Sequence, residues 1–122
     1  MSDFKKLSVW RKAHALLLNV HRTAVTIRGA DYIALRSQML RAAMSVSANI
    51  VEGSGQESRT QFRRFLRVAL NSANELEYHL VASYDLRLIG IEEFKSLSEQ
   101  NTEVRKMLYG LIKRVSADLV TK

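Results

Sequence analysis

The chain has 122 residues, a formal net charge of +7, and neither cysteine nor proline. This length suits a single domain over residues 1–122, and 47% hydrophobic with 25% charged residues is typical of a folded globular protein. Without cysteine there can be no disulfide, thiolate metal site or cysteine nucleophile. No apolar run reaches the about 18 residues of a membrane span, and the first residues lack the apolar core of a signal peptide. We therefore expect a cytoplasmic protein.

The positive charge is unevenly distributed along the chain. Residues 1–74 contain twelve Lys or Arg against four Asp or Glu, whereas residues 75–122 contain seven against eight. A basic protein with a pI near 10.1 favours anionic partners such as nucleic acid or an acidic surface. The alternative interpretation is that the charge serves solubility alone.

Two helices are predicted in the first half of the chain, over residues 8–28 and 31–53. Ser8 and Asp31 are candidate N-caps, and Gly29 suits the left-handed residue that commonly follows a helix. Apolar residues recur at helical spacing in both segments. They are Val9, Ala13, Leu16, Leu17, Val20, Ala24 and Ile27 in the first, and Leu35, Met39, Ala42, Val46 and Ile50 in the second.

Two longer helices are predicted in the second half, over residues 58–89 and 91–120. The glycines of Gly53-Ser54-Gly55 bracket the turn before them, Ser58 is a candidate N-cap, and Gly90 closes the third helix. Their apolar stripes are Phe62, Phe65, Leu66, Ala69, Ala73, Leu76, Leu80 and Tyr84, and then Phe94, Leu97, Val104, Met107, Leu108, Leu111, Val115 and Leu119.

Short junctions between four amphipathic helices predict an all-α fold, an antiparallel up-down-up-down four-helix bundle. At about 30 residues each, the third and fourth helices are roughly 45 Å long and exceed the first two. Their overhang would leave apolar surface uncovered in a monomer. The sequence therefore predicts self-association into a homo-oligomer.

A polar line follows the second helix beside its apolar stripe. Its spacings of 3, 4, 4 and 3 residues place its members within a strip about 80° wide. They are Gln38, Arg41, Ser45, Asn49 and Glu52. The line is interpreted as a hydrogen-bonded seam with a neighbouring helix, or as an oligomer contact or ligand groove. Glu75 of the third helix could pair with Arg41 across such a seam.

Four arginines stand near the start of the third helix: Arg59, Arg63, Arg64 and Arg67. Three of them recur every four residues, on a face opposite the apolar stripe. Cations at a helix N-terminus oppose the helix dipole, and such violations of a local rule tend to mark function. Guanidinium groups there could bind phosphate. The alternative is a solvated face with partners on a neighbouring helix or subunit.

No motif for catalysis or metal binding is recognisable. Di-iron bundles need Glu-x-x-His motifs, which His14, His21 and His79 do not provide. Gly53-Ser54-Gly55 matches neither a nucleophile elbow nor a P-loop. We therefore expect no catalytic residues, no metal and no cofactor, and an enzyme with a cryptic site is the minority hypothesis.

One run of residues matches a known family pattern. It reads Leu35-x-x-Gln38-x-x-Arg41-Ala42-Ala43-x-Ser45-x-x-x-Asn49-x-x-Glu52-Gly53, followed by Phe62, Phe65-Leu66, Ala69, Ser72 and Glu75-Leu76-Glu77, and preceded by Phe4, Leu7, Val9 and Trp10. The chain resembles the bacterial 23S rRNA intervening-sequence proteins, also called S23 proteins. Gly29-Ala30 and Val46-Ser47-Ala48 stand where that family often has proline. The resemblance implies a homopentamer of four-helix bundles and a link to rRNA.

The main functional hypothesis is a homo-oligomeric, RNA-associated protein without enzymatic activity and without a small-molecule substrate. The arginines of the third helix, with Lys5, Lys6, Arg11 and Lys12, would hold phosphate without reading sequence. The rival hypothesis is an adaptor whose basic face docks an acidic protein partner.

Overall fold

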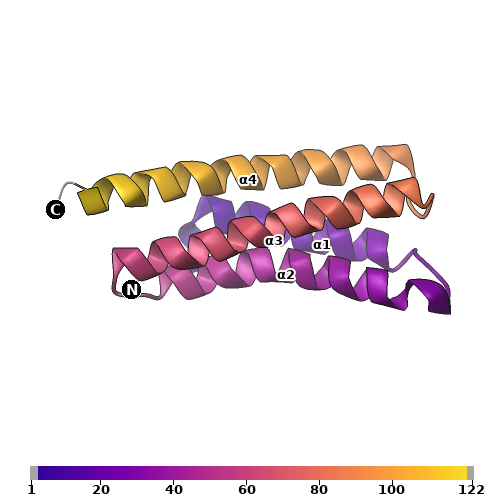
Figure 1. The fold of residues 1–122 in the computed structure, drawn as a ribbon, viewed down its shortest axis with the longest axis horizontal. Coiled ribbons are helices and arrows are strands. Elements are labelled where there is room, and N and C mark those ends of the chain that lie inside the picture. The colour runs from indigo at the N-terminus through magenta and orange to yellow at the C-terminus, as the bar shows by residue number, and fades with distance from the viewer. Residues whose placement is uncertain (1–2, 121–122) are drawn as a thin grey trace.

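The computed structural model describes residues 3–120, which form four antiparallel helices packed side by side (Figure 1). They are α1 (Ser8–Ala24), α2 (Ile33–Ser54), α3 (Arg59–Asp85) and α4 (Ile91–Val120), with short 3-10 helices η1 (Phe4–Lys6) and η2 (Ala30–Tyr32) before α1 and α2. Consecutive helices pack together, and α4 closes the ring against α1. No strand occurs within residues 3–120. The predicted up-down-up-down four-helix bundle is confirmed.

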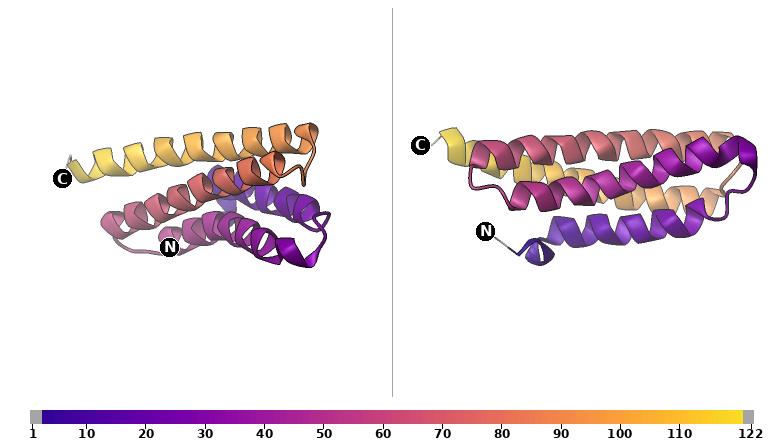
Figure 2. Two further views of the ribbon diagram at one scale, coloured as in Figure 1. Left: turned by 45° about the vertical axis from the view of Figure 1, so that its right-hand side comes forward. Right: turned by 90° about the horizontal axis from the view of Figure 1, so that it is seen from below.

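The core is built from the apolar stripes that the sequence predicts. Each helix contributes side chains that are fully or almost fully buried, and those of α3 and α4 run over most of the length of these helices. The largest of them are Leu16, Met39, Ile50, Leu66, Leu76, Leu80 and Leu108. Each such side chain contributes about 1.5–3 kcal/mol through removal from water. Because the stripes are continuous, the core extends along the bundle. Figure 2 shows from two further sides how the four helices lie next to one another.

The first helix ends at Ala24, four residues before the predicted end at residue 28. The backbone amides of Thr26 and Ile27 bond the carbonyls of Thr23 and Ala24, so the chain tightens into single turns there. These turns bring Ile27 into the core, where it is 3% exposed. Gly29 then takes the positive φ of 107° that its position suggested.

The third helix ends at Asp85, and not at residue 89 as predicted. The amide of Leu88 bonds the Ser83 carbonyl and that of Arg87 bonds the Tyr84 carbonyl, which is the Schellman pattern. Arg87 takes the left-handed conformation, with φ 62°. The prediction that Gly90 closes this helix as its left-handed residue is therefore wrong.

Gly53 lies inside the last turn of α2, so its prediction as a turn residue is also wrong. An added Cβ would lie 3.0 Å from both Phe62 Cδ1 and Phe65 Cβ. The glycine thus lets the start of α3 pack directly against α2. Among the predicted caps, Ser58 is confirmed, since its Oγ accepts a hydrogen bond from the Gln61 amide at 3.0 Å.

The other two predicted caps are wrong. Leu7 occupies the N-cap position of α1, and Ser8 is already helical. Asp31 lies within η2. The prediction of longer third and fourth helices is confirmed, with 27 and 30 residues against 17 and 22 in α1 and α2.

Candidate nucleic-acid interface

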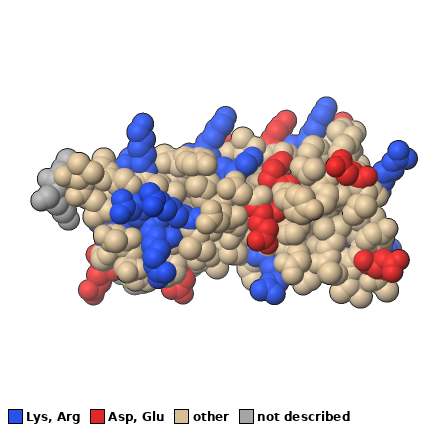
Figure 3. Space-filling view, in the orientation of Figure 1, with Lys and Arg blue, Asp and Glu red and all other residues tan. Residues whose placement is uncertain are grey.

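The antiparallel topology brings basic side chains from three parts of the chain to one end of the bundle. η1 and the start of α1, the start of α3 and the end of α4 all lie there (Figures 1 and 2). We call this surface the basic end, formed by Lys5, Lys6, Arg11, Arg59, Arg63, Arg64, Arg67, Lys113 and Arg114. Figure 3 shows a dense group of Lys and Arg over this end of the face that it displays.

Two of the four arginines of α3 are partnered by α4. Arg59 Nη2 lies 3.1 Å from Asp118 Oδ2, with both side chains about half exposed (47% and 49%). Arg63 Nη1 donates to Ser116 Oγ at 3.4 Å. These two arginines therefore match the alternative of partners on a neighbouring helix, and they help to join the start of α3 to the end of α4.

The other two arginines are more available to a ligand. Arg64 Nε donates to Gln61 Oε1 at 2.9 Å, and its guanidinium lies 4.9 Å from the centre of the Phe65 ring. Arg67 is exposed. Neither takes part in an ion pair within residues 3–120. Both retain an unneutralised positive charge.

The basic residues near the N-terminus differ in the same way. Lys5 and Lys6 are exposed, and Arg11 Nη1 donates to the Lys5 carbonyl at 3.1 Å. Lys12 instead forms an ion pair with Glu103 of α4, at 3.0 Å. Its charge is neutralised, so Lys12 is not part of the basic end.

Lys113 and Arg114 belong to the basic end but were not predicted. They come from the segment 75–122, where acidic and basic residues almost balance. The acidic residues of that segment lie largely along the rest of α3 and α4, so the balance in sequence is not a balance in space. Only the topology shows that they lie at the same end of the bundle as the arginines of α3.

The polar line of α2 is partly a seam with α3. Ser45 Oγ and Ser72 Oγ are 2.7 Å apart, and Asn49 Nδ2 donates to the Ser45 carbonyl at 2.8 Å and to Ser45 Oγ at 3.0 Å. The remaining members of the line are exposed: Gln38, Arg41 and Glu52.

The proposed pairing of Arg41 with Glu75 is wrong. The Glu75 carboxylate lies 3.4 Å from Nε2 of His79, one turn further along α3. Arg41 takes part in none of the ion pairs within residues 3–120. Glu75 reaches His79 on its own helix without spanning the seam between α2 and α3, which explains why it contacts His79 and not Arg41.

A buried polar network between α3 and α4 was missed by the sequence reasoning. Asn101 is fully buried and donates to the Ala73 carbonyl at 2.9 Å and to Glu77 Oε1 at 3.2 Å. Ser98 donates to Glu77 Oε2 at 2.7 Å, and Arg105 Nη2 lies 3.8 Å from Glu77 Oε1. The available signal was Asn101 itself, a polar residue at an apolar-stripe position between Leu97 and Val104.

Within residues 3–120 there is no group of three or more His, Asp or Glu that could hold a metal ion. Over the same residues, no helix has the length and apolar character needed to cross a membrane.

The fold and the surface define a basic, antiparallel four-helix bundle in which Lys and Arg from η1, α1, α3 and α4 gather at one end. The model of the 23S rRNA-intervening sequence protein family matches residues 5–110, and the chain belongs to this family. A solved structure from Bacteroides thetaiotaomicron VPI-5482, described as a protein of unknown function from the S23 ribosomal protein family, is 29% identical. The similarity covers 86% of this chain and 98% of that one, with a TM-score of 0.81. A search of curated proteins finds no match.

Proposed function

We propose that this protein is a non-enzymatic homo-oligomer, with five subunits as the expected number, that binds RNA through its basic end. The observation that carries the proposal is the convergence of Lys and Arg from η1, α1, α3 and α4 on one end, with Arg64 and Arg67 unpaired. The family's name, which refers to intervening sequences of 23S rRNA, supports RNA as the anion.

The binding mode follows from the kind of side chains at the basic end. Exposed Lys and Arg side chains hold phosphate oxygens, and such contacts carry no sequence information. Each subunit of the oligomer repeats the same surface, so several weak contacts add along one RNA chain. Binding should therefore depend strongly on salt and little on RNA sequence.

The test replaces exposed arginines that do not support the fold. Arg64→Glu/Arg67→Glu changes the charge without placing a carboxylate opposite Asp118, as Arg59→Glu would. The matched control, Arg28→Glu/Lys95→Glu, makes the same change in net charge at the opposite end of the bundle. Both variants should keep the helical circular dichroism spectrum of the parent.

RNA affinity is measured for all three proteins with a labelled single-stranded homopolymer over a range of salt. In the parent, log K should fall with log salt by about 0.7 per phosphate contacted. The arginine variant should bind at least about tenfold more weakly with a flatter salt slope, and the control should stay near the parent. Equal loss in both variants would contradict a localised interface. Absence of RNA binding by the parent at low salt would reject the proposal.

The oligomer proposal is supported by large apolar side chains on the outside of the bundle. Tyr78 of α3 is 67% exposed, Tyr109 of α4 is 58% exposed and Met44 of α2 is 55% exposed. Light scattering coupled to size exclusion should give a mass near five times 13.9 kDa. A monomer at micromolar concentration would contradict self-association, and a dimer or tetramer would contradict the expected number.

A further inference from the structure

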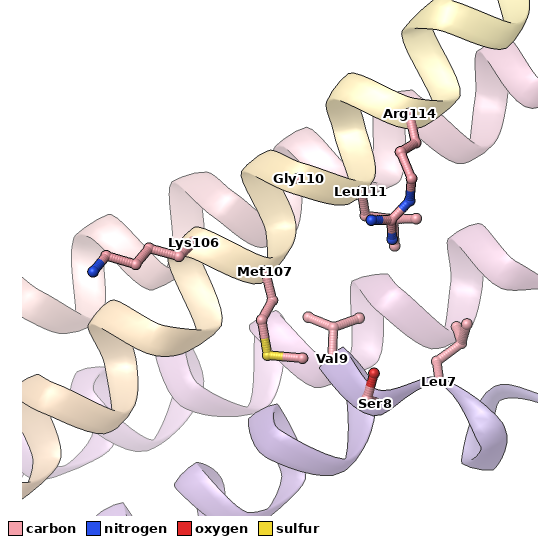
Figure 4. A pocket seen from close by; sticks show the side chains of 8 residues that line it. All are labelled: Leu7, Ser8, Val9, Lys106, Met107, Gly110, Leu111 and Arg114. Atoms are coloured by element: carbon pink, nitrogen blue, oxygen red, sulfur yellow. The ribbon is translucent and has the colours of Figure 1, made fainter.

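A groove runs between the start of α1 and the second half of α4 (Figure 4). None of the arginines of α3 lines it. It encloses about 410 Å³. Its apolar walls come from Leu7 and Val9 on one side and from Met107 and Leu111 on the other. The volume and the aliphatic lining suit one or two apolar side chains of a ligand.

Positive charge borders this groove at both ends of its α4 wall. Lys106 and Arg114 line it, and in Figure 4 the Arg114 side chain reaches toward it. The two residues are eight positions apart, which is about 12 Å along the helix axis. None of the ion pairs within residues 3–120 involves either cation, and no acidic residue lines the groove. A ligand that complements the groove would therefore carry an apolar group with an anionic group on each side of it.

The wall of the groove is open where α4 carries Gly110. Nothing lies within 4 Å of the position that a Cβ would take there, so packing inside this chain does not require a glycine. Glycine in a helix interior is unfavourable relative to alanine. Its presence leaves room for a ligand to approach the helix backbone closely.

We propose that this groove docks an acidic segment of a partner protein. An aliphatic side chain of the segment sits between Val9, Met107 and Leu111, and flanking carboxylates meet Lys106 and Arg114. RNA fits the groove less well, because its aliphatic lining offers no aromatic ring on which a base could stack. The inference does not depend on RNA binding by the arginines of α3.

The experiment selects random peptides of about twelve residues, displayed on phage, for binding to the full-length protein. Such peptides are long enough to span both cations in extended form. The enriched sequences should combine Leu, Ile or Met with flanking Asp or Glu. A selected peptide is then synthesised with a fluorophore, and its affinity for variants is measured by anisotropy.

Gly110→Leu is the decisive variant, since it fills part of the groove without changing charge. It should weaken peptide binding about tenfold or more, the loss expected when a buried anchor is excluded, while the melting temperature does not fall. Gly110→Ala should have a smaller effect. Lys106→Glu/Arg114→Glu should also weaken binding about tenfold or more, whereas the charge-matched control Arg28→Glu/Lys95→Glu should stay within about threefold.

Several results would overturn the proposal. One is a selection that yields no acidic-aliphatic peptides, and another is a selected peptide that binds Gly110→Leu as well as the parent. Displacement of the peptide by oligouridylate, with an equal loss of RNA affinity in Gly110→Leu, would make the groove a nucleotide site. A lower oligomer mass for Gly110→Leu would make it a contact between copies of this chain. Unchanged RNA binding and unchanged mass in Gly110→Leu, with peptide binding lost, is the supporting result.

Discussion

The same substitution, glycine to alanine, should change stability in opposite directions at two helical positions of this bundle. At Gly110 of α4 an added methyl group meets nothing within 4 Å. At Gly53 of α2 it lies 3.0 Å from Phe62 Cδ1, 3.0 Å from Phe65 Cβ and 3.3 Å from the Phe62 carbonyl oxygen. Side-chain chemistry is identical in the two variants, so the tertiary environment alone decides the sign.

The magnitudes follow from two competing effects. Alanine is favoured over glycine in a helix interior by about 1 kcal/mol, and Gly110→Ala should gain about that amount. At Gly53 the same gain is opposed by overpacking, which costs about 1–3 kcal/mol. The Phe62 ring can rotate away, but Phe65 Cβ and the Phe62 carbonyl move only with the α3 backbone. The overpacking cost should therefore lie in the upper part of its range, about 2–3 kcal/mol, so that Gly53→Ala loses about 1–2 kcal/mol of unfolding free energy.

Thermal and urea unfolding, followed by circular dichroism, test both variants against the parent. For a chain of this size 1 kcal/mol shifts the melting temperature by about 3–5 °C, so the two variants should differ by roughly 6–15 °C. Protein concentration is kept equal, because association raises apparent stability. A Gly53→Ala variant that melts at or above the parent would refute the close packing of α2 on α3. A Gly110→Ala variant that melts below the parent would refute an unoccupied site at Gly110.

The remaining predictions concern the helix end, the buried network and the seam. Arg87→Gly should raise unfolding free energy by about 0.5–1 kcal/mol in urea titrations, because it relieves a left-handed φ, whereas Arg87→Ala should change little. Glu77→Ala removes the carboxylate that accepts from Asn101 and Ser98 and pairs with Arg105, and it should cost about 2–3 kcal/mol, measured by the same titration; no loss would show that water replaces the carboxylate in the network. Asn49→Leu removes two hydrogen bonds at the seam and should cost about 1 kcal/mol in thermal melts. Lys12→Leu, which removes an exposed ion pair, should cost less, and equal melting temperatures for the two variants would contradict a structural seam.

The sequence alone determined the bundle itself. Helical periodicity in four segments and short junctions leave few packings for amphipathic helices, and the antiparallel ring is the simplest that buries every stripe. Most residues of the predicted stripes, such as Leu16, Met39 and Leu76, are buried in the structure, whereas Tyr84 is 37% exposed. Ser58 was identifiable as a cap because capping depends only on residues within one turn.

Tertiary structure decided everything that depends on distance across the bundle. Gly53 has the composition of a turn residue, and only the approach of Phe62 and Phe65 shows why glycine is needed within the helix. Arg59 and Lys12 look like free cations in the sequence, and the topology places Asp118 and Glu103 beside them. Pairing of charges depends on their distance through space, and folding makes that distance short between residues that are far apart in the chain. Local pattern therefore predicts which helices form, and packing decides which cations remain free at the basic end.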